Sequence, residues 1–179
     1  SRYREPHRHY HDVRHLRWVV RHVEDLGAAA TDLDAVIAAA FFHDAVYDPA
    51  ANGNEEASAR LATTALVELA WEPAQIDGVA SMIVATDRHD LSDATGDATV
   101  LFAADLAVLA ADPAGYSDYV RNVRREYHHV ADADWVTGRS AVLRSFLERD
   151  RIYAAELDLD TWEQRARGNI TSELDTLTT

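Results

Sequence analysis

Two short segments of this chain carry apolar side chains on almost every side, AVIAAAFF at 35–42 and VLFAADLAVLA at 100–110. A helix that is apolar all round is normally buried in a core. Glycine and proline are sparse and alanine, the best helix former, is abundant. The sequence has no convincing strand-like alternation, no internal repeat and no linker long enough to separate domains. It therefore predicts one all-α domain over residues 1–179.

Hydrophobic spacing and turn residues predict a bundle of about seven to eight helices. The first is amphipathic, with valines and leucines at helical spacing, and ends near Gly27. The expected helices cover 11–26, 33–46, 55–70, 73–89, a segment that contains 100–110, 113–130, 133–153 and 161–177. The last of them could pair two copies of the chain in a homodimer.

Composition excludes several classes of function. The chain has no cysteine, so disulfides, thiolate nucleophiles and zinc–thiolate sites are ruled out. A net charge of −14 argues against general binding to nucleic acids or to anionic membranes, since both need a positive surface. No apolar run approaches the length of a membrane span, and the N-terminus shows no signal-peptide pattern. These features fit a cytoplasmic protein.

Positive charge is concentrated at one end of the chain and is carried by arginine alone. Residues 1–22 hold six arginines and five of the nine histidines, and the sequence contains no lysine. Arginine is planar and bidentate, which suits it to phosphate. This segment predicts an anionic ligand that binds locally, although a solvated helix face would have the same composition.

The two apolar segments raise the same chemical question. His43 and Asp44 follow 35–42 directly, and Asp105 lies inside 100–110. An ionised carboxylate is costly to bury unless it is paired or bound to a metal. Pairing with arginine or capping of a neighbouring helix would explain either aspartate alone. Two such aspartates, one of them beside a histidine, point to a bound cation.

The first helix supplies further candidate ligands. His11, His15 and His22 are spaced by four and seven residues along one stripe of that helix. One or two of these imidazoles could join His43, Asp44 and Asp105 around one ion. A mixed nitrogen and oxygen set suits Mn, Fe, Co, Ni or Zn better than Ca. His22 also fits the ordinary role of a hydrogen-bonded core histidine.

The order of these residues on successive helices resembles a known signature. His15, then His43-Asp44, then Asp105 is similar to the H…HD…D pattern of the HD-domain superfamily of metal-dependent phosphohydrolases. A bacterial group of predicted phosphohydrolases within it has segments much like five segments of this chain, in the same order over most of residues 5–153. These segments are EPHRHYHDVRH, FFHDAVYDP, NEEASA, ADLAVL and RREYHHV.

The resemblance implies a helical fold and a metal held by His15, His43, Asp44 and Asp105, with His15 preferred to His11. Mg²⁺ is also compatible with such a site. The family often has an extra acid where this chain has Ala103, which favours one metal per chain. The implied activity is hydrolysis of a phosphate ester or anhydride, most often of a nucleotide, by metal-activated water. The alternatives are a di-iron oxygenase of the same fold and a non-catalytic nucleotide-binding module.

Other residues are candidates for catalysis and substrate binding. Besides Asp44, Glu55 and Glu56 are the candidate acid–base pair, with Glu55 slightly preferred. The competing interpretation is a helix-capping box between Asn52 and Glu55. The expected phosphate or substrate contacts are Arg8, His11, His89 and Arg124. His89 also fits a plain histidine at a helix C-terminus.

Overall fold

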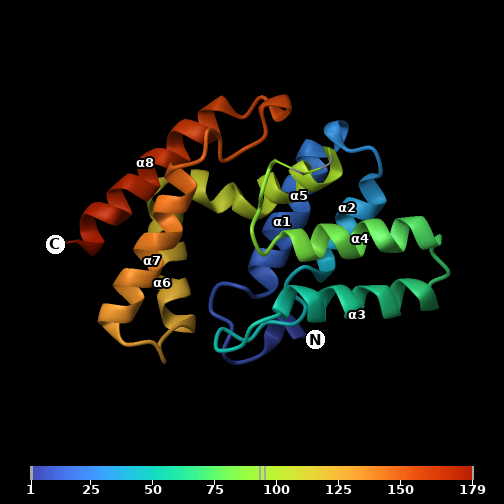
Figure 1. Cartoon of the computed structure of the whole chain (residues 1–179), viewed down its shortest axis with the longest axis horizontal. Helices are drawn as coiled ribbons and strands as arrows, with labels where there is room; N and C mark the ends of the chain where they lie inside the picture. The colour runs from blue at the N-terminus through green and yellow to red at the C-terminus, as the bar shows by residue number, and fades with distance from the viewer. Residues whose placement is uncertain (1, 93, 95, 179) are drawn as a thin grey trace. The chain divides into compact units, whose positions relative to one another are not determined.

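The chain is all-helical, as the sequence predicts. A computed structural model describes residues 2–92, 94 and 96–178, and within this part it contains eight α-helices, short 3₁₀ segments and no β-strand. Figure 1 shows their order along the chain. No single helix of the described residues is long and apolar enough to cross a membrane.

The helices divide into two compact units. Unit 1 is Ser1–Asp105 and unit 2 is Leu106–Thr179. All of the predicted metal ligands lie in unit 1, and the boundary falls directly after the last of them. That the two units act as one domain stays a prediction.

Unit 1 consists of five α-helices. They are α1 (Val13–Leu26), α2 (Leu33–Phe42), α3 (Asn54–Glu68), α4 (Pro73–Ala85) and α5 (Gly96–Asp105). Helices α3 and α4 pack side by side, α2 packs on α4 and α1, and α1 packs on α5. The two segments that are apolar all round therefore become α2 and α5, in the interior of the unit.

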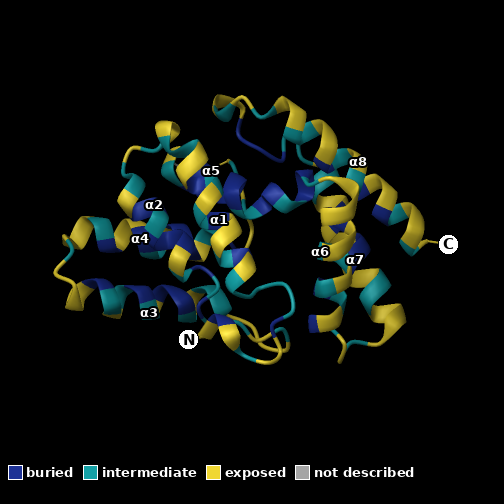
Figure 2. Cartoon of the chain, turned by 180° about the vertical axis from the view of Figure 1, so that it is seen from behind, coloured by how far each residue is buried: buried dark blue, intermediate teal, exposed yellow. Residues whose placement is uncertain are grey.

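Small and branched apolar side chains fill the core of this unit. Figure 2 shows buried residues where its helices face one another. Because many of them are alanines, the helix backbones can approach closely, and little side-chain entropy is lost on burial. The fully buried members include Val19, Val23, Val36, Ala39, Ala40, Ala62, Val79, Ile83, Val100, Leu101 and Ala104.

Two helices of unit 1 end earlier than the sequence predicts. Helix α2 stops at Phe42 instead of continuing to 46, so His43 is its C-cap and Asp44 lies in the turn beyond it. Here the amide of Ala45 bonds the carbonyl of Phe42, which tightens the chain into a turn. Helix α4 stops at Ala85 instead of 89. Both corrections place candidate site residues on helix ends.

Unit 2 comprises the 3₁₀ segment η3 (Leu106–Ala110) and helices α6 (Pro113–Glu126), α7 (Asp132–Leu147) and α8 (Asp160–Leu177). The expected single helix over 100–110 thus changes from α to 3₁₀ directly after Asp105, and α7 ends before 153. Within this unit a buried ion pair joins two helices, because Arg139 Nε donates to Glu173 Oε1 over 2.7 Å. Tyr116 Oη donates to the same carboxylate.

Candidate metal centre

Four of the predicted ligands come together where helices of unit 1 begin or end. His15 lies in the first turn of α1, His43 caps the C-terminus of α2, Asp44 follows it, and Asp105 is the last residue of α5. The imidazoles are deeply buried, with side chains 2% exposed for His15 and 1% for His43. The carboxylates keep a narrow contact with solvent, at 18% for Asp44 and 15% for Asp105. The site is therefore internal but open on the side of the carboxylates.

The facing atoms of these four side chains converge on one point. Nε2 of His15 lies 3.2 Å from Nε2 of His43. It also lies 3.3 Å from Oδ2 of Asp44 and 3.1 Å from Oδ1 of Asp105. Nε2 of His43 lies 3.1 Å and 3.5 Å from the same two oxygens. Each nitrogen thus lies 3.1–3.5 Å from the other nitrogen and from both oxygens, and the set whose ligand atoms all lie close to one another is His15, His43 and Asp44.

These separations fit the donor atoms of a metal ion. Ligands about 2.1 Å from an ion lie about 3.0 Å apart in octahedral geometry and about 3.4 Å apart in tetrahedral geometry. His43 also has the matching tautomer, because its Nδ1 donates to the carbonyl of Ala40 over 2.8 Å and so leaves a lone pair on Nε2. The cluster of His15, His43 and Asp44 could therefore hold a metal ion.

The charges of the cluster are strongly coupled. Burial alone would raise the pKa of Asp44 and Asp105, but the neighbouring histidines outweigh it and hold both pKa values well below their usual range. Burial alone would lower the pKa of His15 and His43, but the two carboxylates raise both, and that of His43 well above its usual value. Without a metal, the carboxylates thus favour protonated imidazoles, and a cation would replace those protons.

Aromatic rings enclose the α1 side of the cluster. The centroid of the Tyr10 ring lies 4.8 Å from that of His15, and the His11 ring lies 5.4 Å from it. His11 also packs on Tyr47 at 4.3 Å, and its charge contributes to the low pKa of Asp44. The buried Nδ1 of His15 has no hydrogen-bond partner among the described residues. Because His11 contacts His15 and Tyr47 through its ring, it lies beside the cluster and not in it. His22 bonds the carbonyl of Trp18 along α1.

His89 reaches the cluster from the end of α4. Its Nε2 lies 2.8 Å from Oδ2 of Asp105, the oxygen that does not face His15 and His43. Its backbone has φ of +47°, in the left-handed region that few side chains other than glycine adopt without strain. The turn after α4 thus places an imidazole against the outer oxygen of Asp105. The sequence resemblance had singled out this histidine but not its contact.

Glu55 and Glu56 occupy the first turn of α3. The capping interpretation is wrong, because the N-cap is Gly53 in a left-handed conformation and no side chain of the described residues caps it. Burial, together with the charges of Asp87 and Asp44, raises the pKa of Glu55. Glu55 is thus within electrostatic reach of the cluster, whereas Glu56 is exposed.

The two arginines expected to contact phosphate have other partners. Arg8 has a side chain with no exposed area, bonded to Glu5 and to backbone carbonyls, so it offers no surface to a phosphate. The burial of Arg8 therefore does not support the phosphate contact that the sequence predicts for it. Arg124 belongs to unit 2, where it bonds the carbonyls of Tyr127 and Val130 and the carboxylate of Asp132. A phosphate contact of Arg124 stays a prediction.

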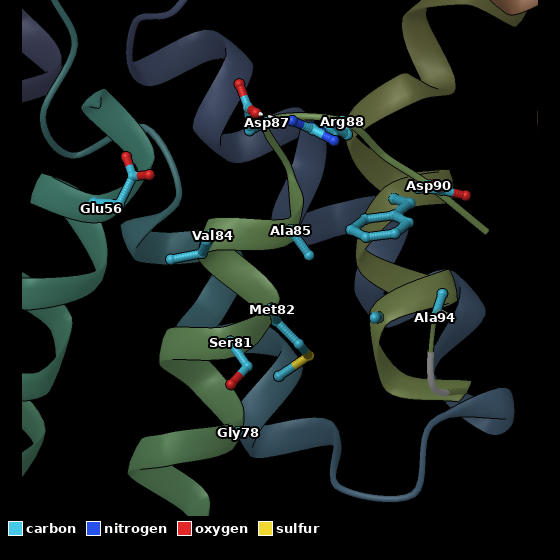
Figure 3. A pocket seen from close by; sticks show the side chains of 12 residues that line it. Glu56, Gly78, Ser81, Met82, Val84, Ala85, Asp87, Arg88, Asp90 and Ala94 are labelled. Atoms are coloured by element: carbon cyan, nitrogen blue, oxygen red, sulfur yellow. Dashed lines mark ion pairs between the residues drawn. The ribbon is translucent and has the colours of Figure 1, made fainter. Parts of the chain in front are cut away.

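A pocket of about 760 Å³ lies between α3, α4, α5 and the turn after α4. Figure 3 shows Met82 and Ala85 on α4, with Asp87 and Arg88 at its end and Glu56 on α3. Phe102 also lines it, and its ring centroid lies 5.2 Å from that of His89. Phe102 therefore connects this pocket to His89, which in turn contacts Asp105.

Sequence reasoning missed several residues that shape the site. Ser58 of α3 is fully buried, and its Oγ accepts from the amide of Val46 and donates to the carbonyl of the same residue. It fixes the turn that contains Asp44. Phe102 was read only as part of an apolar segment. The one feature of the sequence that could have pointed to Ser58 is its place in NEEASA, a segment that resembles the HD-domain group.

Comparisons with known proteins do not identify this chain. No family model, curated protein or solved structure matches it.

The coupled charges predict how the stability of the metal-free protein depends on pH. The raised pKa values of His15 and His43 stabilise the fold below about pH 6.5, their ordinary value, and this contribution is lost as the pH rises through the folded values. The lowered pKa values of Asp44 and Asp105 stabilise it above about pH 3.8, a contribution lost as the pH falls through their folded values. Thermal unfolding after chelation should therefore give a higher Tm at pH 6 than at pH 9.

The control for this measurement is a histidine outside the cluster. His43→Gln should flatten the fall in Tm between pH 6 and pH 9, whereas His22→Gln should leave it as in the unaltered protein. A fall of the same size in all three proteins would show that the cluster does not cause it.

Proposed function

We propose that this chain is a metal-dependent phosphohydrolase of the HD type, which hydrolyses a phosphate ester or anhydride of a small molecule. The observation that supports it most is that two imidazole nitrogens lie 3.2 Å apart and each lies 3.1–3.5 Å from one oxygen of Asp44 and one oxygen of Asp105. All four come from the residues that the sequence resemblance names as ligands. A purely structural ion pair would not need two histidines whose Nε2 atoms both face the same two carboxylates.

In this proposal His15, His43, Asp44 and Asp105 hold one divalent transition metal ion of the Mn, Fe, Co, Ni or Zn group. Such an ion supplies water activation near neutral pH and polarises a phosphoryl oxygen. The protein orients the ligands through their neighbours: Ala40 fixes the ring of His43, and His89 holds the outer oxygen of Asp105.

Glu55 is the proposed proton donor to the leaving group. Its carboxyl is half-buried at the start of α3, and burial with the nearby charges of Asp87 and Asp44 raises its pKa. A carboxyl group with a raised pKa keeps its proton closer to neutral pH, which a general acid requires. Glu56, on the same turn but exposed, lines the pocket and is the second candidate.

His11 and His89 are the proposed phosphate contacts. His11 precedes α1, and His89 follows α4, between the ligands Asp44 and Asp105 in the sequence. His11 packs on His15 and Tyr47, and His89 contacts Asp105. An imidazole that donates a hydrogen bond to a phosphoryl oxygen would hold the substrate beside the carboxylates without adding to the protein's negative charge.

The pocket beside His89 is the proposed place for the organic part of the substrate. Its volume of about 760 Å³ lies within the range of small-molecule sites. Phe102, Met82 and Ala85 give it an apolar wall, while Asp87 and Arg88 form an ion pair at its edge. An apolar wall of this size with an aromatic ring suits a nucleobase, so a nucleotide is the proposed substrate class.

The metal assignment is tested by metal content. The protein as purified should carry one equivalent of transition metal after dialysis, and His43→Ala and Asp105→Ala should lose it together with phosphate release from nucleotides. His22→Ala is the matched control on the α1 stripe and should keep both. Stoichiometric metal in the first two variants would overturn the assignment.

The proton-transfer role is tested at the first turn of α3. Glu55→Gln keeps the size of the side chain but removes the acid, so we expect turnover to fall ~10²-fold or more with metal content unchanged. Glu56→Gln is the neighbouring control and should keep most activity. If the two results are exchanged, Glu56 is the acid; if both variants work normally, neither is.

The role of the pocket is tested by filling it. Ala85→Phe places a ring in the space beside Met82, so KM for a nucleotide should rise several-fold while metal content stays at one equivalent. Val67→Phe makes a similar enlargement on the exposed face of α3 outside the pocket lining, and its KM should not change. An unchanged KM in Ala85→Phe would place the substrate elsewhere.

A further inference from the structure

The turn that carries Asp44 depends on side chains from the start of the chain. The last carbonyls of a helix lack partners within the helix and need donors from elsewhere. Tyr3 Oη donates to the carbonyl of Phe41 over 2.9 Å, and His7 Nε2 lies 2.9 Å from the carbonyl of Tyr47. Between these two positions, the guanidinium of Arg8 donates hydrogen bonds to the carbonyls of Asp44 and Ala45.

Arg8 is the centre of this contact. Its Nη1 donates to the carbonyl of Asp44 over 2.8 Å and to the carbonyl of His11 over 2.9 Å. Its Nη2 donates to the carbonyl of Ala45 over 3.3 Å, and its Nε donates to the Glu5 carboxylate over 2.9 Å. Its donors thus serve two separate stretches of backbone at once.

Two of these partners belong to the segments that supply metal ligands. His11 lies one turn before His15, and Asp44 is itself a ligand in the proposed function. The guanidinium therefore ties the approach to α1 to the turn after α2. Because a planar fork has fixed donor directions, it sets both distance and orientation between the two stretches.

Aromatic rings fix the plane of this guanidinium. Its central carbon lies 5.2 Å from the centroid of the Tyr3 ring and 5.4 Å from that of Tyr47. Such cation–π contacts strengthen when the cation is removed from water, and the Arg8 side chain has no exposed area. The guanidinium of Arg8 therefore contacts two aromatic rings through its face and makes hydrogen bonds through its N–H groups.

We propose that Arg8 is a positioning residue for the metal centre, which acts through the backbone of Asp44 and His11 and not through contact with substrate. This inference rests on the proposed function, because it needs a metal at Asp44. It replaces the phosphate contact that the sequence predicts for Arg8. Lysine cannot reproduce it, since an ammonium group has no fork to span three carbonyls.

The test is Co²⁺ binding to the full chain, because visible absorption of Co²⁺ reports its coordination geometry as well as its affinity. Arg8→Lys should bind Co²⁺ about 10-fold or more weakly, the scale of lost support behind metal ligands, with an altered spectrum. Arg139→Lys is the matched control, since Arg139 is also buried, bonds Glu173 in unit 2 and should leave both readouts unchanged. Guanidinium ion added to Arg8→Ala should restore part of the affinity.

The outcomes separate the two proposals. If the unaltered protein binds no Co²⁺, the proposed function fails. If it binds, but Arg8→Lys has the same affinity and spectrum and only a raised KM, Arg8 is a substrate contact and the positioning role is overturned. If Arg8→Lys does not fold, Glu5→Gln tests the positioning role instead. This variant weakens the hydrogen bond that Arg8 Nε donates to the Glu5 carboxylate, and it changes a side chain that is partly exposed. A several-fold weaker affinity in Glu5→Gln supports the role, and an unchanged affinity overturns it.

Discussion

The cost of burying charge is the constraint on which unit 1 depends. Asp44 follows the end of α2 and Asp105 ends α5, two helices that are apolar almost all round, and neither carboxylate could remain ionised there alone. Two buried imidazoles compensate the charge of the carboxylates, because the Nε2 atom of each faces both of them. The four groups make one coupled electrostatic unit, so removing any one leaves the others with uncompensated charge. In the proposed function a cation would take the place of the protons on the imidazoles.

Most of the site residues lie at the ends of helices. Helices α2, α4 and α5 all end at the site, at His43, near His89 and at Asp105, and the C-terminus of a helix carries partial negative charge. The ends of α2 and α4 therefore favour positive charge nearby, whereas α5 passes directly into the 3₁₀ segment η3. Helices α1 and α3 begin there instead, with His15 and Glu55 in their first turns. Side chains from helix ends also reach inward without interrupting a hydrogen-bonded backbone.

The sequence is informative where a pattern has one physical meaning. A segment that is apolar on every side is normally buried, so the burial of α2 and α5 could be predicted, together with the need of Asp44 and Asp105 for a partner. The points at which α2 and α4 end could not, because the contacts that stop α2 at Phe42 come from Tyr3 and Arg8, some forty residues away. Arg8 shows the same limit: arginine suits phosphate and carbonyl groups equally, and only its burial decides between them. The capping box failed because Gly53 takes the cap position with a conformation that spacing does not reveal.

The boundary directly after Asp105 has a consequence for the order in which the molecule is made. All four ligand residues, together with Arg8, Ser58 and His89, precede Leu106. At about 5–20 residues per second, a ribosome needs roughly 4 to 15 seconds to add Leu106–Thr179. During that interval the nascent chain already contains every proposed ligand. In the proposed function an ion could therefore bind unit 1 before unit 2 has been synthesised, and it would stabilise unit 1 during that time.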